Sequence, residues 1–146
     1  MALSKKDRED FLAQSSLVAT ISISAQQGRG PLAVPVWYQY QVGGEPWLIT
    51  SARSRKAELI YAAGAFTLSV ARSEPTVRYV TVDGVLGRVE KTTAQQLEQM
   101  AARYLSGDAL TRYLASAIPT LDELVTMYMT PQHWNSGDLG ADYEDA

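Results

Sequence analysis

The sequence predicts a mainly β domain with a few helices, in which about six antiparallel strands close into a small barrel. Segments whose hydropathy alternates with period two recur along the chain, and the helical patterns between them are short. The chain has 146 residues, 46% of them hydrophobic, which suits one domain with a real core. Closure into a barrel follows because it removes the exposed edges of a sheet.

The N-terminal part predicts a short helix followed by a strand. Residues 5–14 have a helical pattern, and Ser4 is a possible N-cap. From Leu17 to Ser24 apolar and hydroxyl side chains alternate, as in a strand with one wet or ligand-facing side. We therefore divide the chain into an N-terminal helix (residues 1–15), a barrel domain (16–135) and an acidic, flexible tail (136–146).

The next stretch predicts a hairpin. Hydropathy alternates from Leu32 to Tyr40, Gly43-Gly44 suits a tight turn, and a second strand begins at Pro46. Pro35 has no N–H to donate to a ladder, so it marks a sheet edge, a bulge or a place where a planar ligand approaches the backbone.

A basic helix start follows the hairpin. Ser54 is the expected N-cap of a helix that ends before Gly64, so Arg55 and Lys56 fall in its first turn. Cations there oppose the helix dipole by roughly 0.3–1 kcal/mol each, and a bound anion would explain them. The alternative is a solvated basic turn paired with Glu58 or the acidic tail. The residues of the predicted anion pocket are Thr50, Ser51, Arg53, Ser54, Arg55 and Lys56.

The rest of the chain adds strands and a helical pair. Phe66 to Val70 alternates, and residues 77–90 predict one long strand, bent rather than reversed at Asp83-Gly84. Thr93 to Gln96 fits a capping box. The helix that it opens should end at Gly107, and the next, capped by Asp108, at Pro119; the last strand is expected over 125–130.

Composition excludes several classes of protein. Without cysteine there is no thiolate metal site, disulfide or thiol nucleophile. The net charge of −3 argues against a general nucleic-acid binder. No apolar run reaches the length of a membrane span, and the polar start lacks a secretory pattern, so we expect a cytoplasmic protein with no membrane partner. His133 is the only histidine, and we predict no metal site.

Five segments together resemble the pyridoxamine 5′-phosphate oxidase-like split β-barrel family of flavin- and deazaflavin-binding proteins. They are residues 17–22, 28–38, 46–51, 54–57 and 79–90. The resemblance implies a six-stranded antiparallel split barrel of the FMN-binding type, assembled as a homodimer with two cofactor sites at the interface. It implies FMN or coenzyme F420 as cofactor, with the ring system along the backbone of Val34, Pro35, Val36 and Trp37, and the phosphate at Thr50, Ser51, Arg55 and Lys56.

The resemblance also has a limit. A true pyridoxamine phosphate oxidase is expected to hold its substrate's phosphate with arginines in the C-terminal part, but no Lys or Arg follows Arg112 here. We therefore expect an oxidoreductase that uses FMN or F420 for hydride transfer with a small organic substrate. No acid–base residue stands out, so the catalytic residues are unknown. Residues that could reach a cofactor from the partner subunit or the last strand are Arg78, Arg88 and Trp134.

Two alternatives stay open. One is a non-catalytic carrier or sensor of flavin, deazaflavin or haem on the same fold. The other is a nucleic-acid binder that uses aromatic residues such as Trp37 beside the basic turn, which the net acidity opposes.

Overall fold

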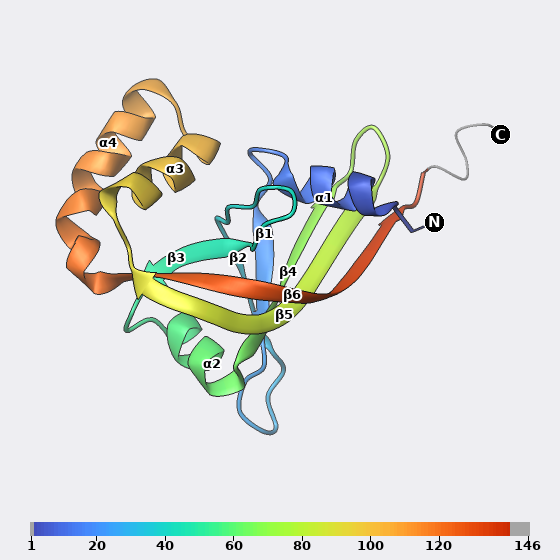
Figure 1. Cartoon of the computed structure of the whole chain (residues 1–146), viewed down its shortest axis with the longest axis horizontal. Helices are drawn as coiled ribbons and strands as arrows, with labels where there is room; N and C mark the ends of the chain where they lie inside the picture. Colours follow the sequence, from blue (N-terminus) through green and yellow to red (C-terminus); the bar gives the residue numbers. More distant parts are fainter. Residues whose placement is uncertain (1, 141–146) are drawn as a thin grey trace.

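A computed structural model describes residues 2–140, which form one curved sheet with helices at its ends (Figure 1). The helices are α1 (Lys5–Ala13), α2 (Arg55–Ala63), α3 (Ala94–Tyr104), α4 (Gly107–Ala117) and the 3-10 helix η1 (Ile118–Glu123). The strands are β1 (Ala19–Ile23), β2 (Leu32–Val36), β3 (Trp47–Ser51), β4 (Ala65–Arg72), β5 (Arg78–Lys91) and β6 (Leu124–Asp138). No helix of this part of the chain is long and apolar enough to cross a membrane.

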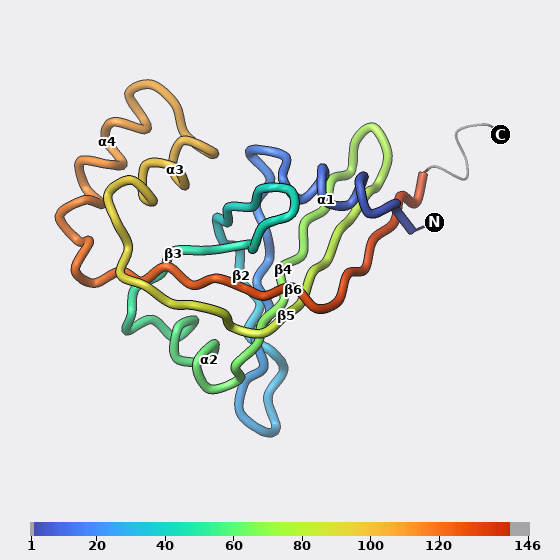
Figure 2. The backbone as a smooth tube through the Cα atoms, in the orientation of Figure 1, coloured from blue at the N-terminus to red at the C-terminus, as the bar shows by residue number. Residues whose placement is uncertain are grey.

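The six strands form one antiparallel sheet in the order β2-β1-β4-β5-β6-β3. This confirms the predicted mainly β, six-stranded antiparallel class. Pro35 lies on β2, at one edge of the sheet, as its missing N–H requires. The long strands β5 and β6 curve together and give the sheet its half-barrel shape (Figure 2).

The bend at Asp83-Gly84 is confirmed. Strand β5 runs through it without reversal, and its register against β6 shifts between these two residues. A side chain at Gly84 would collide with the carbonyl oxygen of Thr130 on β6, so only glycine allows the two backbones to approach this closely.

The predicted hairpin over residues 32–51 is wrong in its strand pairing, because β2 and β3 do not pair with each other. The reversal itself is present: the N–H of Gly44 donates to the carbonyl of Gln41 (2.8 Å), and Gly43 has φ 81°. However, β2 ends at Val36 and pairs with β1, whereas β3 pairs with β6 at the other edge. A single bridge between Gln39 and Trp47 is what remains of the expected pairing. The two strands thus leave the turn toward opposite edges of the sheet.

The last strand is longer than predicted. β6 continues from the expected end at residue 130 to Asp138, because its C-terminal half pairs with the first half of β5, from Asp138 opposite Arg78 onward. Residues 136–138 of the predicted tail therefore belong to the sheet. Residues 141–146 of that tail lie outside the described part of the chain.

The helix signals were mostly correct. Ser4 and Ser54 cap α1 and α2 through their hydroxyls, and the capping box at Thr93 is complete. α3 ends three residues before the predicted stop, and Gly107, with φ 57°, begins α4 instead of ending α3. Ser106, not Asp108, occupies the N-cap position of α4.

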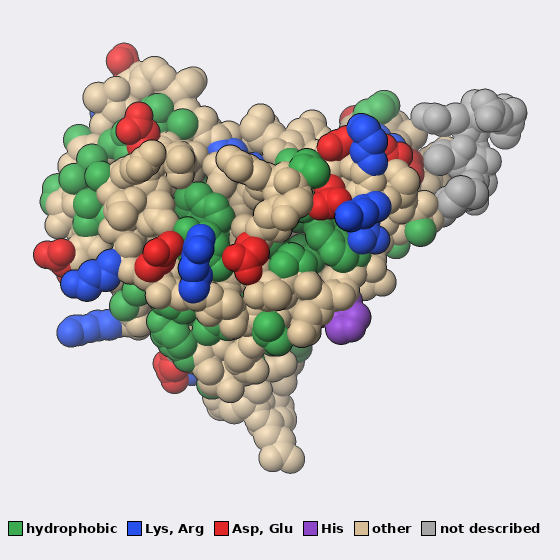
Figure 3. Space-filling model, viewed as in Figure 1, with side chains coloured by type: hydrophobic (Ala, Val, Ile, Leu, Met, Phe, Trp, Pro, Cys, Tyr) green, Lys and Arg blue, Asp and Glu red, His purple; other side chains and the backbone are tan. Residues whose placement is uncertain are grey.

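The core lies inside the curve of the sheet. It contains alternate residues of every strand together with apolar residues of α1 and α2, among them Leu12, Ile21, Leu48, Ile60 and Leu68. The helical pair α3–α4 stands outside this core, beside the ends of β3 and β6 (Figure 1). On the face drawn in Figure 3, acidic side chains lie next to basic ones.

Candidate functional site

A cavity of about 360 Å³ lies between the sheet and the helical pair. One wall is the end of β2 with the residue after it, the second is β3 with the start of α2, and the third comes from α3, α4 and η1. The lining residues are Pro35, Val36, Trp37, Ile49, Thr50, Ser51, Lys56, Leu97, Met100, Tyr113, Ala117, Thr120 and Leu124. The volume is within the range of small-molecule sites, roughly 300–1,000 Å³.

Trp37 forms an aromatic wall of this cavity. Its indole stacks on the ring of Tyr104, with centroids 4.8 Å apart and planes at 12°, and the ring of Tyr113 lies at 5.3 Å, tilted by 47°. Offset stacking of this kind adds about 0.5–1.5 kcal/mol per pair beyond area burial. The indole therefore contacts an aromatic side chain from each helix of the pair.

The polar end of the cavity is the start of α2. The Ser54 hydroxyl accepts a hydrogen bond from the N–H of Ala57 (3.1 Å) and lies 2.9 Å from the Thr50 hydroxyl. Lys56, in the first turn, lines the same cavity. A helix start presents N–H groups and a partial positive charge, so together with Lys56 it favours an anionic group.

Six predicted site residues come together here: Pro35, Val36, Trp37, Thr50, Ser51 and Lys56. Two other predicted residues support the site without lining it. The side chain of Val34 packs against the core, and Ser54 caps α2.

The two arginines of the basic turn point elsewhere. The Arg55 guanidinium donates to Glu58 (3.3 Å) and to the Gln26 side chain (3.2 Å), and the side chain is 48% exposed. Arg53 borders a separate hollow that also contains Asp122 and Glu123. Arg55 therefore fits the alternative of a solvated basic turn paired with Glu58. Of the three basic residues, Lys56 is the one that lines the cavity.

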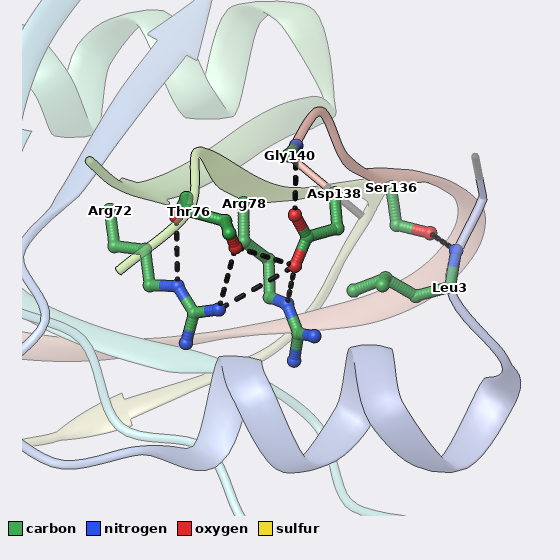
Figure 4. A network of polar contacts seen from close by, with 7 residues as sticks. All are labelled: Leu3, Arg72, Thr76, Arg78, Ser136, Asp138 and Gly140. Atoms are coloured by element: carbon green, nitrogen blue, oxygen red, sulfur yellow. Dashed lines mark hydrogen bonds and ion pairs between the residues drawn. The ribbon is translucent and has the colours of Figure 1, made fainter. Parts of the chain in front are cut away.

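The residues expected from the last strand or a partner subunit do not line this cavity. Arg78 donates to the Asp138 carboxylate (3.0 Å), which Thr76 also contacts (2.9 Å), at the far end of β5 (Figure 4). Arg88 lies over the Tyr128 ring, 3.9 Å from its centroid, and is 64% exposed.

Trp134 packs close to α1. The Arg8 guanidinium lies 4.8 Å from its ring centroid, and the Tyr40 ring lies 6.2 Å away in an edge-on arrangement. Arg78 and Trp134 are therefore engaged within the chain, whereas Arg88 stays largely exposed.

Sequence reasoning missed the helical wall. Leu97, Met100 and Tyr113 lie on the two helices that the sequence predicts after Thr93, but periodicity does not say which surface the apolar face of a helix covers. It also missed Arg103 and Tyr104 at the end of α3. The Arg103 guanidinium donates to the carbonyls of Leu12, Ala13 and Gln14, at 3.2, 3.3 and 2.8 Å, and so caps the C-terminus of α1.

Ionisable groups around the cavity are few. Of the described residues that line it, Lys56 alone carries a charge at neutral pH. Burial raises the pKa of the Tyr113 phenol, so that side chain stays neutral. Burial also raises the pKa of Tyr38, next to Trp37, to about 12, and its hydroxyl donates to the Leu12 carbonyl (2.6 Å). Residues 2–140 hold no group of three His, Asp or Glu side chains arranged for a metal ion.

Similar folds occur among solved structures. A conserved hypothetical protein from Mycobacterium tuberculosis superposes with a TM-score of 0.71 at 21% identity, over 94% of this chain and 86% of that one. An F420 reductase superposes with a TM-score of 0.67 at 17% identity, over 86% of this chain and 94% of that one. A putative pyridoxamine 5′-phosphate oxidase from Listeria innocua superposes with a TM-score of 0.60 at 13% identity, over 92% of this chain and 98% of that one. No protein-family model and no curated protein matches the sequence.

These structural similarities establish the fold. The chain has the split-barrel fold of the pyridoxamine 5′-phosphate oxidase type, as the sequence resemblance implied. Identities at this level say nothing by themselves about activity.

Proposed function

We propose that the cavity binds a flavin-type cofactor, FMN or coenzyme F420, and that the protein uses it for hydride transfer to or from a small organic substrate. The observation that carries the proposal is the convergence of Trp37, Thr50, Ser51 and Lys56 on one cavity at the start of α2. The names of two similar folds, an F420 reductase and a putative pyridoxamine phosphate oxidase, support the same class.

The chemistry of the lining fits such a group. The apolar side chains of Val36, Trp37, Leu97 and Met100 suit a planar ring system, and the helix start with Lys56 suits a phosphate. The bound flavin or deazaflavin would supply the hydride chemistry. The chain's own residues would bind and orient it: Lys56 neutralises the phosphate, Trp37 fixes one wall, and the helical pair excludes water.

The proposed assembly is a homodimer. A second copy would cover the open side of each cavity and could bring Arg88, which is exposed on β5, toward the cofactor of its neighbour. Val85, on the same strand, is 37% exposed, which suits burial against another chain. A true pyridoxamine phosphate oxidase activity is not proposed, because no Lys or Arg follows Arg112.

A non-catalytic carrier is the second candidate. The observation that favours it is the near absence of proton-transferring groups among the described lining residues, where Tyr113 is neutral and Lys56 faces the anion site. Reduction of the loaded protein by a hydride donor, followed by reoxidation by a small acceptor, would argue for the enzyme. A cofactor that binds but never turns over would argue for the carrier.

The first experiment is a visible spectrum of the purified protein, followed by fluorescence titration with FMN and with F420. We expect one of them to saturate a single site per chain. Lys56→Ala should weaken that binding at least tenfold, while Lys5→Ala, which removes an exposed lysine on α1, should leave it unchanged. If neither compound binds, the flavin proposal fails, and haem and single-stranded oligonucleotides become the next ligands to test.

A further inference from the structure

The hydroxyl of Tyr104 lies between the ends of two strands. It accepts a hydrogen bond from the N–H of Tyr38 (3.1 Å), just beyond β2, and donates to the carbonyl of Leu17 (2.8 Å), just before β1. The carbonyl of Tyr38 is also within hydrogen-bond distance of it, at 3.0 Å. One side chain of α3 thus contacts both strand ends through backbone atoms.

The strand register explains why this position matters. Ala19 pairs with Val36 and Thr20 with Pro35, so two more residues in each direction would set Leu17 opposite Tyr38. In an antiparallel ladder, pairs that exchange hydrogen bonds alternate with pairs that do not. Pro35 has no N–H, which suits the second kind of pair. If Pro35 and Thr20 form a non-hydrogen-bonded pair, the alternation makes Leu17 and Tyr38 a hydrogen-bonded pair. The Tyr38 N–H would then donate directly to the Leu17 carbonyl.

The Tyr104 hydroxyl takes the place of that ladder bond. It satisfies the same donor and the same acceptor, but an oxygen atom between them holds the strand ends apart by roughly one further hydrogen-bond length. The ladder ends at Ala19 and Val36, just short of this contact. Trp37, on the segment that is set free, stacks its indole on the ring of the same tyrosine (4.8 Å, 12°).

Arg103 fixes the inserted tyrosine from the other side. Its guanidinium binds three carbonyls at the end of α1 and the side-chain oxygen of Gln39 (3.0 Å), and it lies 4.5 Å from the centroid of the Tyr38 ring. The end of α3 is therefore tied both to α1 and to the segment after β2. Tyr104 does not line the cavity itself, whereas its stacking partner Trp37 does.

We propose that Tyr104 is a positioning residue for the cavity: its hydroxyl ends the β1–β2 ladder, and its ring holds Trp37 in the cavity wall. The effect on a ligand rests on the proposed function, because it assumes that the cavity binds FMN or F420. The strand insertion does not depend on any ligand.

Tyr104→Phe removes the hydroxyl and keeps the ring, and the exposed Tyr61 on α2 offers a matched control, Tyr61→Phe. Amide hydrogen exchange of the free protein tests the insertion. We expect the Tyr38 N–H to exchange at least tenfold faster in Tyr104→Phe than in Tyr61→Phe, because the hydroxyl acceptor is lost while the remaining ring still keeps the Leu17 carbonyl out of reach. Equal exchange rates in the two variants would overturn the proposal.

A double-mutant cycle tests the link to Trp37. Tyr104→Phe should weaken binding of FMN or F420 three- to tenfold in the wild-type background and have no further effect in a Trp37→Leu background. A merely structural role would lower the unfolding temperature and give additive effects on the dissociation constants, and additivity would overturn the proposal. If neither cofactor binds to the wild type, the proposed function fails, whereas the exchange experiment still decides the insertion.

Discussion

Trp37 and Tyr104 lie face to face, 4.8 Å apart, although one follows the edge strand β2 and the other ends helix α3. This contact joins the helical pair to the sheet at the rim of the cavity. α4 itself has no buried residue, but the ring of its Tyr113 also lies 5.3 Å from the Trp37 ring. Aromatic contacts around one indole therefore help to hold the outer helices, together with the hydrogen bonds of Arg103 to the end of α1.

The basic turn predicts a definite order of effects. Lys56→Ala should weaken binding of FMN or F420 at least tenfold, because Lys56 lines the cavity. Arg55→Ala should weaken the same binding threefold or less, because that guanidinium already contacts Gln26 and Glu58 and is half exposed. Fluorescence titrations at two salt concentrations measure both values. A larger loss for Arg55→Ala than for Lys56→Ala would show that the arginine turns toward the ligand on binding.

Glu9 predicts a loss of stability in acid. The Tyr40 hydroxyl donates to its carboxylate (2.7 Å), and this bond, with a smaller contribution from the Gly43 N–H, lowers the pKa of Glu9 against the opposing effect of burial. A carboxyl whose pKa is lower in the folded state stabilises fully above its unfolded pKa, about 4.3. That contribution is lost as the pH falls through the folded pKa.

The free energy of unfolding in urea, measured from pH 7 down to pH 3, tests this link between α1 and the segment after β2. We expect Glu9→Gln to be less stable than wild type at pH 7 and the two curves to converge below pH 4. Glu58→Gln, at a side chain that is 69% exposed, serves as the control and should follow wild type throughout. Parallel curves for Glu9→Gln and wild type would contradict the assignment.

The sequence predicted the individual helices and strands better than it predicted which strands pair with one another. The caps at Ser4, Ser54 and Thr93 and the bend at Gly84 were correct, because each depends on a few neighbouring residues. The hairpin between β2 and β3 failed for the opposite reason. A local turn at Gly43-Gly44 fits the sequence, but β2 pairs instead with the strand before it, β1, and β3 pairs with β6 from the other end of the chain. The turn residues carry no signal for either pairing.

The candidate site shows the same division. Residues 35–37, 50, 51 and 56 could be placed from two neighbouring segments, since β3 leads directly into α2. The third wall could not, because nothing in the apolar spacing of α3 and α4 says that they fold back over β2. The contacts of the Tyr104 hydroxyl could not be predicted either, because its partners are backbone atoms, which have no sequence signature.

Gly84 predicts a large packing effect. Any side chain there would meet the Thr130 carbonyl and the Met129 side chain at the crossing of β5 and β6. Gly84→Ala should therefore lower the free energy of unfolding by about 3 kcal/mol, an overpacking cost on rigid backbone. Gly30→Ala is the matched control, because a Cβ there meets no atom within 4 Å. Equal stability of the two variants in urea unfolding would contradict the close approach at the bend.

Ser54 allows the helix cap and the anion site to be separated. Ser54→Ala removes the hydroxyl that accepts the Ala57 N–H, so we expect a loss of about 1 kcal/mol in the free energy of unfolding and a small effect on ligand binding. Ser54→Asp keeps a capping oxygen and places a negative charge at the helix start, which the dipole favours, so stability should be retained.

The order of the two variants should reverse for ligand binding: Ser54→Asp, the more stable variant, should bind FMN or F420 more weakly than Ser54→Ala. The new carboxylate of Ser54→Asp would lie beside Thr50 at the polar end of the cavity, where it repels an anion and competes for Lys56. We therefore expect Ser54→Asp to weaken FMN or F420 binding at least tenfold and Ser54→Ala less than threefold. Urea unfolding and fluorescence titration of the same preparations measure both effects. If Ser54→Asp binds as tightly as wild type, the phosphate does not lie at the start of α2, and the anion site must be sought elsewhere on the chain.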